Sequence, residues 1–180
     1  HRKTAGSALR ASLSAGNRTA ACLLLLGYFP DAANAAALRA TIQEFGAERT
    51  KLTDSMPLVS VTLPAQVALS QLGDPAARED LLRAIPRASV AEAEFLLSVL
   101  RDIDSPTVLH AIKNMLGDGR EIASGVPSGA GPRRRVQDAA VNALVDRLKL
   151  KVSFDLTDSR RYSDEQIAQT RALIDKSLPH

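Results

Sequence analysis

The sequence predicts an all-α protein built from helical hairpins. Its apolar fraction is 45%, largely Ala and Leu, whereas aromatic residues make up only 3%, a mixture that favours packed helices over strands. Residues 64–86 have the apolar spacing of two amphipathic helices. Between these helices, Gly73 can adopt the left-handed backbone that ends a helix, Asp74 can cap the next one, and Pro75 fits its first position. Because one hairpin cannot bury both of its faces, neighbouring hairpins are expected.

Further helices are expected on both sides of this hairpin. The same apolar periodicity predicts helices over residues 2–15, 31–45, 90–103, 106–116, 133–150 and 163–178, and another that runs through the four leucines 23–26 to Gly27. That last helix is capped by Asn17 or Thr19, and residues 89–92 and 163–166 have the spacing of capping boxes. The turn at residues 104–106 repeats the chemistry of residues 73–75 after about 30 residues, a period typical of helical repeats.

Residues 47–64 are the least regular part of the first half. Residues 47–55 are polar and predict a long connection, with extension of a helix over part of them as the alternative. Residues 57–64 alternate β-branched residues and can be read as a strand or as a helix. A lone strand would have no partner. We therefore expect a helix that is kinked or restarted at Pro64.

Residues 117–132 predict a surface loop between hairpins. This stretch, GDGREIASGVPSGAGP, is rich in glycine and proline, and no packed element is expected there. A phosphate-binding loop is disfavoured because no strand precedes it and no GK[ST] follows. Ile122 and Val126 are exposed apolar candidates for contact with a partner, or they fold back onto the protein.

Charge and cysteine content exclude several classes of function. The formal charge of +3, from 23 basic and 20 acidic residues, does not argue for a polyanionic partner. Cys22 is the only cysteine, which rules out an intrachain disulfide and a cysteine-based metal site, and its apolar surroundings predict a buried structural thiol. No apolar run reaches the 18 residues of a membrane-spanning helix. The chain opens at His1, so we expect that a leader was removed, and cytoplasm and periplasm both remain open.

No residue pattern points to catalysis. His110 is the only internal histidine and has no HxxxH or HExxH partner. The carboxylate pairs Glu92 with Glu94 and Asp102 with Asp104 are two residues apart, so on a helix they point in different directions. We therefore expect no enzyme activity, no cofactor and no metal.

Two basic clusters are the candidate partner-binding residues: Arg133, Arg134 and Arg135, then Arg160 and Arg161. Both clusters precede predicted helices, where positive charge opposes the helix dipole and gives no local stabilisation. An acidic protein surface or a nucleic-acid phosphate would supply the missing counter-charge, and solvated loop residues are the alternative. Nucleic acid is the weaker partner, because two Tyr, four Phe and no Trp provide little base stacking.

Residues 68–75, ALSQLGDP, followed by Leu81 and Leu82, resemble HEAT-type repeats, including the short bacterial variety also seen in bilin lyases. In that family a proline often kinks the first helix and an Asp-Pro turn leads into the second. Residues 21–38, 95–109 and 139–148 are looser copies, and the insertions at 47–55 and 117–132 depart from the pattern. The resemblance implies one domain over residues 1–180, a right-handed α-solenoid of about four antiparallel hairpins. Its repeat units are residues 17–46, 56–86, 89–117 and 133–178.

The resemblance also implies a concave surface that holds another protein. We therefore expect a non-catalytic protein–protein interaction scaffold, of which a bacterial immunity protein or an adaptor is a concrete form. A DNA-binding protein resembling HEAT-like base-excision glycosylases and a bilin-lyase-like enzyme are the alternatives. The first is disfavoured by the few aromatic residues and the balanced charge, and the second by the lack of an identifiable acid–base group. The repeat pattern leaves the partner and the oligomeric state open, because the residues that define it are those that pack the helices together and not those that contact a partner.

Overall fold

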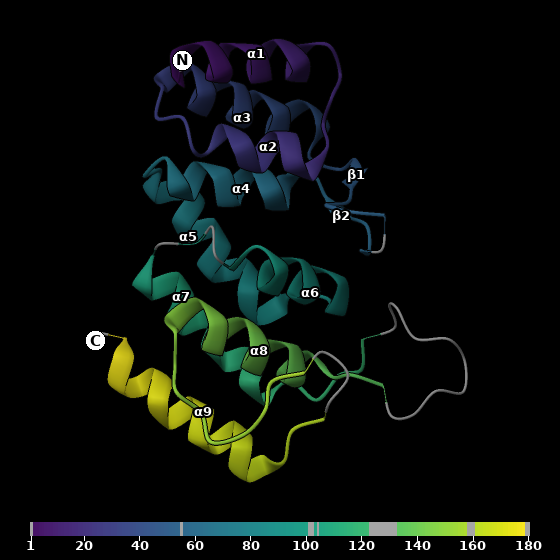
Figure 1. Ribbon diagram of the computed structural model, residues 1–180. Helices are drawn as coiled ribbons and strands as arrows, with labels where there is room; N and C mark the ends of the chain where they lie inside the picture. Colours follow the sequence, from purple (N-terminus) through teal and green to yellow (C-terminus); the bar gives the residue numbers. More distant parts are fainter. Residues whose placement is uncertain are drawn as a thin grey trace. The chain divides into compact units, whose positions relative to one another are not determined.

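The computed structural model describes residues 2–54, 56–100, 103, 105–122, 133–157 and 161–178 (Figure 1). Over these residues the structure is mostly helical, with one short two-stranded ladder and one isolated β-bridge. The predicted all-α class is thus confirmed in broad terms. The chain divides into two compact units, residues 1–84 and residues 85–180.

The first unit is organised around a central helix, α4. Its elements are α1 (Arg2–Ser14), α2 (Ala20–Leu26), α3 (Ala32–Phe45), β1 (Arg49–Thr50), β2 (Val59–Ser60), α4 (Thr62–Gln71) and α5 (Pro75–Ala84). Helix α4 contacts α2, α3 and α5, and α1 contacts α2 and α3 (Figure 1). The buried residues of α4 are all apolar, namely Leu63, Pro64, Ala65, Val67, Ala68 and Leu69.

The core of this unit is made mainly of leucine and alanine. Leu23, Leu26 and Leu38 are fully buried and pack together with Ala65 and Ala68 of α4. Burying each leucine contributes about 1.5–3 kcal/mol. Cys22 lies in the same cluster, as predicted, and burial raises the pKa of its thiol.

The turn between α4 and α5 follows the sequence prediction. Gly73 has a φ of +85°, the left-handed conformation that favours glycine. The Asp74 Oδ1 accepts hydrogen bonds from the backbone N–H groups of Ala76 (3.0 Å) and Ala77 (3.2 Å) and so caps α5. Its Oδ2 accepts from Arg39 of α3, at 3.0 Å from Nε and 2.6 Å from Nη2. Burial alone would raise the pKa of Asp74, but these hydrogen bonds lower it below its ordinary value.

The same kind of contact occurs two helices earlier, at the start of α3. Asp31 caps α3 by accepting from the N–H of Ala33 at 2.8 Å, and Arg10 of α1 donates to the other carboxylate oxygen at 3.3 Å. In both places an arginine from an earlier helix pairs with the aspartate that caps a later one. These pairs therefore join helix caps to neighbouring helices twice within the unit.

The predicted helix restart or kink at Pro64 is wrong. Residues 59–60 form a strand that pairs antiparallel with residues 49–50, with Thr50 opposite Val59. The partner strand lies within the polar stretch 47–55, for which no strand was expected. Helix α4 begins at Thr62, so Pro64 falls in its first turn, where its missing N–H costs no intrahelical bond.

The second unit is organised around α8. Its elements are the 3₁₀ turn η1 (Ile85–Arg87), α6 (Val90–Ser98), α7 (Pro106–Lys113), the 3₁₀ turn η3 (Asn114–Gly117), α8 (Val136–Leu148) and α9 (Asp164–Ser177). Helix α8 contacts α6, α7, η3 and α9. The capping boxes Ser89 with Glu92 and Ser163 with Gln166 are present as predicted, and Ser105 caps α7 just before Pro106. Helix α6 ends at Ser98, well short of the predicted end at residue 103.

The loop predicted over residues 117–132 is partly packed. The Ile122 N–H donates to the carbonyl of Arg134 at 2.8 Å, and the Val136 N–H donates to the carbonyl of Arg120 at 2.9 Å. Glu121 and Arg135 form an antiparallel bridge between these bonds. The expectation of no packed element is therefore wrong for residues 118–122, whereas residues 123–132 lie outside the described part of the chain.

Gly27 marks a close approach between α2 and α4. A Cβ added there would lie 1.9 Å from the Gln71 Oε1 and 3.0 Å from the Cα and carbonyl oxygen of Ala68. Since the Ala68 backbone cannot rotate away, we expect Gly27→Ala to destabilise the protein by about 1–3 kcal/mol. Urea denaturation measures this, with Gly119→Ala as control because its nearest neighbour would be 3.9 Å away. Equal midpoints for the two variants would contradict the expected clash.

Asp74 both caps α5 and pairs with Arg39. Truncating Asp74 therefore removes the helix cap and the ion pair, whereas truncating Arg39 removes the ion pair alone. The Asp74 side chain is 7% exposed and that of Arg39 is 55% exposed. We expect Asp74→Ala to lower the free energy of unfolding by about 1–2 kcal/mol and Arg39→Ala by less than about 1 kcal/mol. The two variants are compared by urea denaturation at one pH. A larger loss for Arg39→Ala would show that the ion pair outweighs the cap.

Candidate partner-binding surface

The basic cluster before α8 is anchored by a buried ion pair. The guanidinium of Arg135 donates to Asp138 through Nε (2.9 Å to Oδ2) and Nη2 (2.8 Å to Oδ1). The Asp138 side chain is fully buried, and the Arg135 side chain is 20% exposed. The two-point geometry fixes the orientation of both side chains and is the strong form of such a pair.

The Asp138 carboxylate also accepts two backbone N–H groups. The N–H of Arg135 donates to it at 2.9 Å and the N–H of Tyr162 at 3.0 Å. Burial alone would raise the pKa of this carboxyl, but the hydrogen bonds from Arg135 and from the backbone hold the pKa below its ordinary value. Asp138 therefore stays ionised and ties the start of α8 to the segment that precedes α9.

Tyr162 extends this network to the chain that follows α8, through hydrogen bonds that involve Asn142 and Thr157. Its backbone carbonyl accepts from Arg135 at 2.9 Å, and its hydroxyl donates to the Asn142 side chain at 2.5 Å. The N–H of Thr157 donates back to the same hydroxyl at 3.1 Å. The Tyr162 ring packs against Phe154 at a centroid distance of 5.2 Å. These contacts hold the segments on both sides of residues 158–160 against α8.

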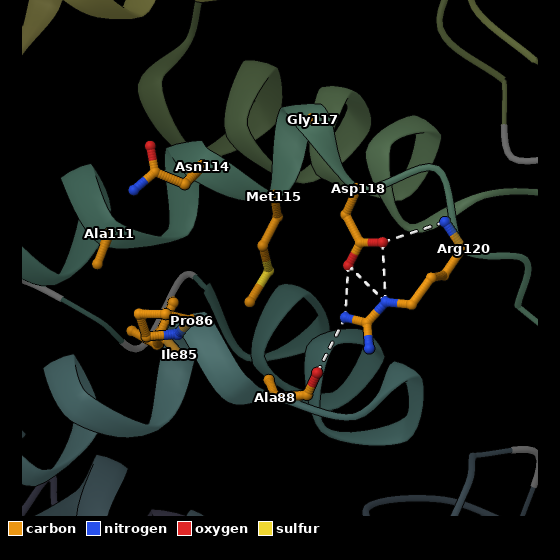
Figure 2. A pocket seen from close by; sticks show the side chains of 9 residues that line it. All are labelled: Ile85, Pro86, Ala88, Ala111, Asn114, Met115, Gly117, Asp118 and Arg120. Carbon is orange, nitrogen blue, oxygen red and sulfur yellow. Dashed lines mark hydrogen bonds and ion pairs between the residues drawn. The ribbon is translucent and has the colours of Figure 1, made fainter.

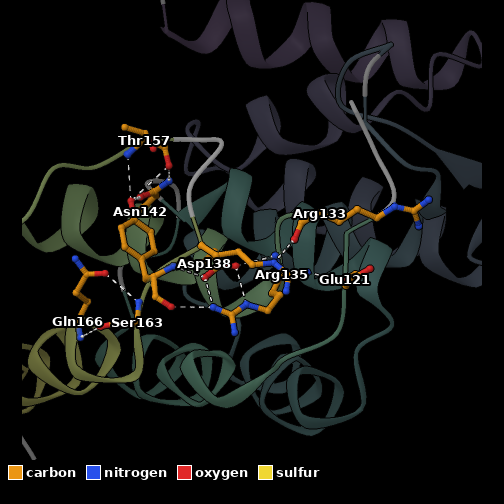
Figure 3. A network of polar contacts seen from close by, with 10 residues as sticks. Glu121, Arg133, Arg135, Asp138, Asn142, Thr157, Ser163 and Gln166 are labelled. Atoms are coloured by element: carbon orange, nitrogen blue, oxygen red, sulfur yellow. Dashed lines mark hydrogen bonds and ion pairs between the residues drawn. The ribbon is translucent and has the colours of Figure 1, made fainter. Parts of the chain in front are cut away.

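Arg161 and Arg133 lie at the edge of the same network. The Arg161 Nε donates to the carbonyl of Arg133 at 2.7 Å, and its Nη2 pairs with Glu121. The Arg133 side chain is exposed and extends away from the network (Figure 3). Within the described ranges no acidic side chain pairs with it. Arg133 is thus a cation presented to solvent from a backbone that its neighbours hold in place.

The predicted partner-binding residues therefore separate into different roles. Arg135 is committed to Asp138, Arg161 is shared between Glu121 and the backbone, and Arg134 is half-buried. Ile122 is only 4% exposed, so it folds back, the second of the two outcomes that the sequence left open. Val126 and Arg160 lie outside the described residues.

The first unit exposes an apolar pair that the sequence analysis missed. Leu25 is 47% exposed and Tyr28 is 54% exposed, although the other leucines of α2 are almost wholly buried. Leu25 lies in the last turn of α2 and Tyr28 lies in the turn that follows, where its N–H donates to the Leu25 carbonyl at 3.2 Å. Because a helix turns by 100° per residue, one of the four consecutive leucines, Leu25, is left outside the core. The i, i+3 spacing of a leucine and a tyrosine is the signal that could have indicated this pair.

Two hollows lie in the second unit. The first hollow, of about 420 Å³, is lined by residues of η1, α7 and η3 and by Ala88. Asp118 and Arg120, in the segment that follows η3, line one side of it (Figure 2). The other, of about 450 Å³, lies between η3 and α9 and includes Arg171, Asp164 and Asp175. Gly117 lines both hollows.

No group of three or more His, Cys, Asp or Glu side chains that could hold a metal ion occurs in the described ranges. His110 lies partly exposed on α7. No helix in that part of the chain is long and apolar enough to span a membrane.

No protein-family model, curated protein or solved structure matches this chain. Each unit thus presents one candidate contact feature: the exposed Leu25 and Tyr28 in the first unit, and the exposed Arg133 in the second.

Replacing Asp138 tests how much the second unit depends on the buried ion pair. Asp138→Asn leaves the Arg135 guanidinium without its counter-charge, so we expect a loss of about 3–5 kcal/mol in the free energy of unfolding at pH 7. The pKa of Asp138 is lower in the folded state than its unfolded value of about 3.9, so its contribution is present above that value and is lost as the pH falls through the folded pKa.

The difference between wild type and Asp138→Asn should therefore shrink below about pH 5. Urea denaturation from pH 7 to pH 3 measures it. Asp155→Asn, at an exposed position, serves as the matched control and should change stability by less than about 0.5 kcal/mol. A difference that is independent of pH would contradict an ionised, stabilising Asp138.

Proposed function

We propose that this chain is a HEAT-like helical-repeat module that binds another protein and catalyses no reaction. The observation that carries the proposal is the exposed pair Leu25 and Tyr28 at the end of α2. Leucine and tyrosine side chains that are left half-exposed gain free energy when a partner covers them. Tyrosine is also enriched among the residues that dominate binding energy at protein interfaces.

The packing of the first unit supports the repeat architecture. Helix α2 contacts α4, as expected when the first helices of the hairpins at residues 17–46 and 56–86 stack side by side. The contacts of Arg10 with Asp31 and of Arg39 with Asp74 occupy equivalent places in this stack. Because each hairpin buries its faces only against its neighbours, the architecture leaves an extended surface for a partner.

Arg133 supports an acidic contact region on the partner. Its side chain is exposed, while Arg135 and Arg161 hold the surrounding backbone through their own hydrogen bonds. A carboxylate of the partner can form a charge-assisted hydrogen bond with this guanidinium. Such a rim contact mainly raises the rate of association and the selectivity for the partner.

A capture experiment from the source organism's lysate tests the proposed function. The immobilised full chain should retain one protein in stoichiometric amount, identified by mass spectrometry. We expect the double variant Leu25→Asp/Tyr28→Ala to reduce the affinity for that protein at least about a hundredfold, because a buried charge replaces an apolar contact. Arg133→Glu should reduce it about tenfold, with a marked dependence on salt.

Matched controls separate binding from folding. Leu156→Asp changes another leucine that is 40% exposed, and Lys151→Glu reverses another exposed cation. Both controls should keep the wild-type affinity, and all variants should keep the wild-type melting curve. Retention of nucleic acid without a protein, or full affinity of the Leu25→Asp/Tyr28→Ala variant, would refute the proposal.

A further inference from the structure

The hollow of about 420 Å³ in the second unit has one apolar wall and one polar side. Ile85, Ala88 and Met115 line it and are each 5–6% exposed, and Ala111 of α7 completes the apolar wall. In Figure 2 the Met115 side chain extends from η3 into the space between Asn114 and Arg120, toward Ala88. A volume of this size is within the range of small-ligand sites, about 300–1,000 Å³.

One side of the hollow carries a fixed guanidinium. The Arg120 Nε donates to Asp118 at 2.9 Å (Oδ1) and 3.1 Å (Oδ2), and Nη2 donates to Asp118 at 2.6 Å and to the carbonyl of Ala88 at 2.9 Å (Figure 2). The remaining terminal nitrogen, Nη1, has no hydrogen-bond partner among the residues that the structure describes. The side chain is held in place although it is 52% exposed, so a ligand would meet an oriented donor.

We propose that this hollow binds a small apolar monocarboxylate. The ligand carboxylate accepts hydrogen bonds from Nη1 of Arg120, and its hydrocarbon part covers Met115 and Ile85. The exposed Asn114 amide, at the edge of the hollow, supplies a further donor. This site is separate from the surface proposed for protein binding.

The charges around the hollow select this class of ligand. A cationic ligand is disfavoured, because both oxygens of Asp118 already accept from Arg120. A phosphate or dicarboxylate brings two negative charges, whereas Arg120 is the only basic side chain in the lining and Asp118 already neutralises it. A single carboxylate can use Nη1 and adds one negative charge beside Asp118, where a phosphate or dicarboxylate would add two.

Methyl NMR with octanoate as the probe tests the proposal. The chain contains two methionines, Met56 and Met115, so [¹³C]methyl-methionine labelling gives one reporter in the hollow and one internal control. We expect a saturable shift of the Met115 signal with sodium octanoate and no shift of the Met56 signal. Octan-1-ol, with the same chain and no charge, should bind at least about tenfold more weakly, because it loses the charge-assisted hydrogen bond.

Two variants separate the guanidinium from the apolar cavity. Arg120→Gln should reduce octanoate affinity at least about tenfold and leave octanol affinity unchanged. Ala111→Leu fills the cavity from α7 and should weaken both probes, while Lys151→Gln, which removes an exposed cation elsewhere, should change neither. If a variant fails to fold, the difference in affinity between octanoate and octan-1-ol for the wild-type protein still tests the proposal. Equal affinity for octanoate and octanol, or equal shifts of both methionines, would overturn the proposal.

Discussion

The second unit depends on the buried carboxylate of Asp138. Removing an ionised carboxylate from water costs several kcal/mol, so it is tolerated only where charge and hydrogen bonds replace the lost hydration. Arg135 and the N–H groups of Arg135 and Tyr162 provide that replacement. Because the donors come from two separate segments, satisfying Asp138 also fixes the start of α8 against the approach to α9.

Both proposed functional features of this unit follow from that constraint. With the start of α8 fixed, the N–H of Val136 and the carbonyl of Arg134 hold residues 120–122 in an antiparallel arrangement. That arrangement places Arg120 where Asp118 and the carbonyl of Ala88 orient its guanidinium beside the hollow. It also holds the backbone from which Arg133 extends. A single internal ion pair thus positions two cations that face solvent.

The sequence predicted the features that depend on local chemistry. Gly73 and Asp74 form the expected turn, and Ser89 and Ser163 form the expected caps, because these motifs need only residues three or four apart. The β-ladder was missed because Thr50 and Val59 become partners only when the chain between them folds back. Likewise, the burial of Ile122 and the contact of Arg135 with Tyr162 depend on residues far apart in sequence, which periodicity and capping rules do not address.

The basic cluster shows why charge in a sequence is a poor guide to a binding surface until the partners are known. Three consecutive arginines have the same formal charge, yet Arg135 is neutralised inside the protein and Arg133 is not. The internal pair contributes no field to attract a ligand, but it removes the conformational entropy that a mobile loop would lose on binding. Arg133 can therefore bind a partner with less loss of backbone freedom, because Arg135 is used to hold the backbone and not to contact the partner. The same reasoning applies to Arg120, because the ion pair with Asp118 both orients and neutralises its guanidinium. Preorganisation by internal charge pairs is thus the property that the two proposed sites share.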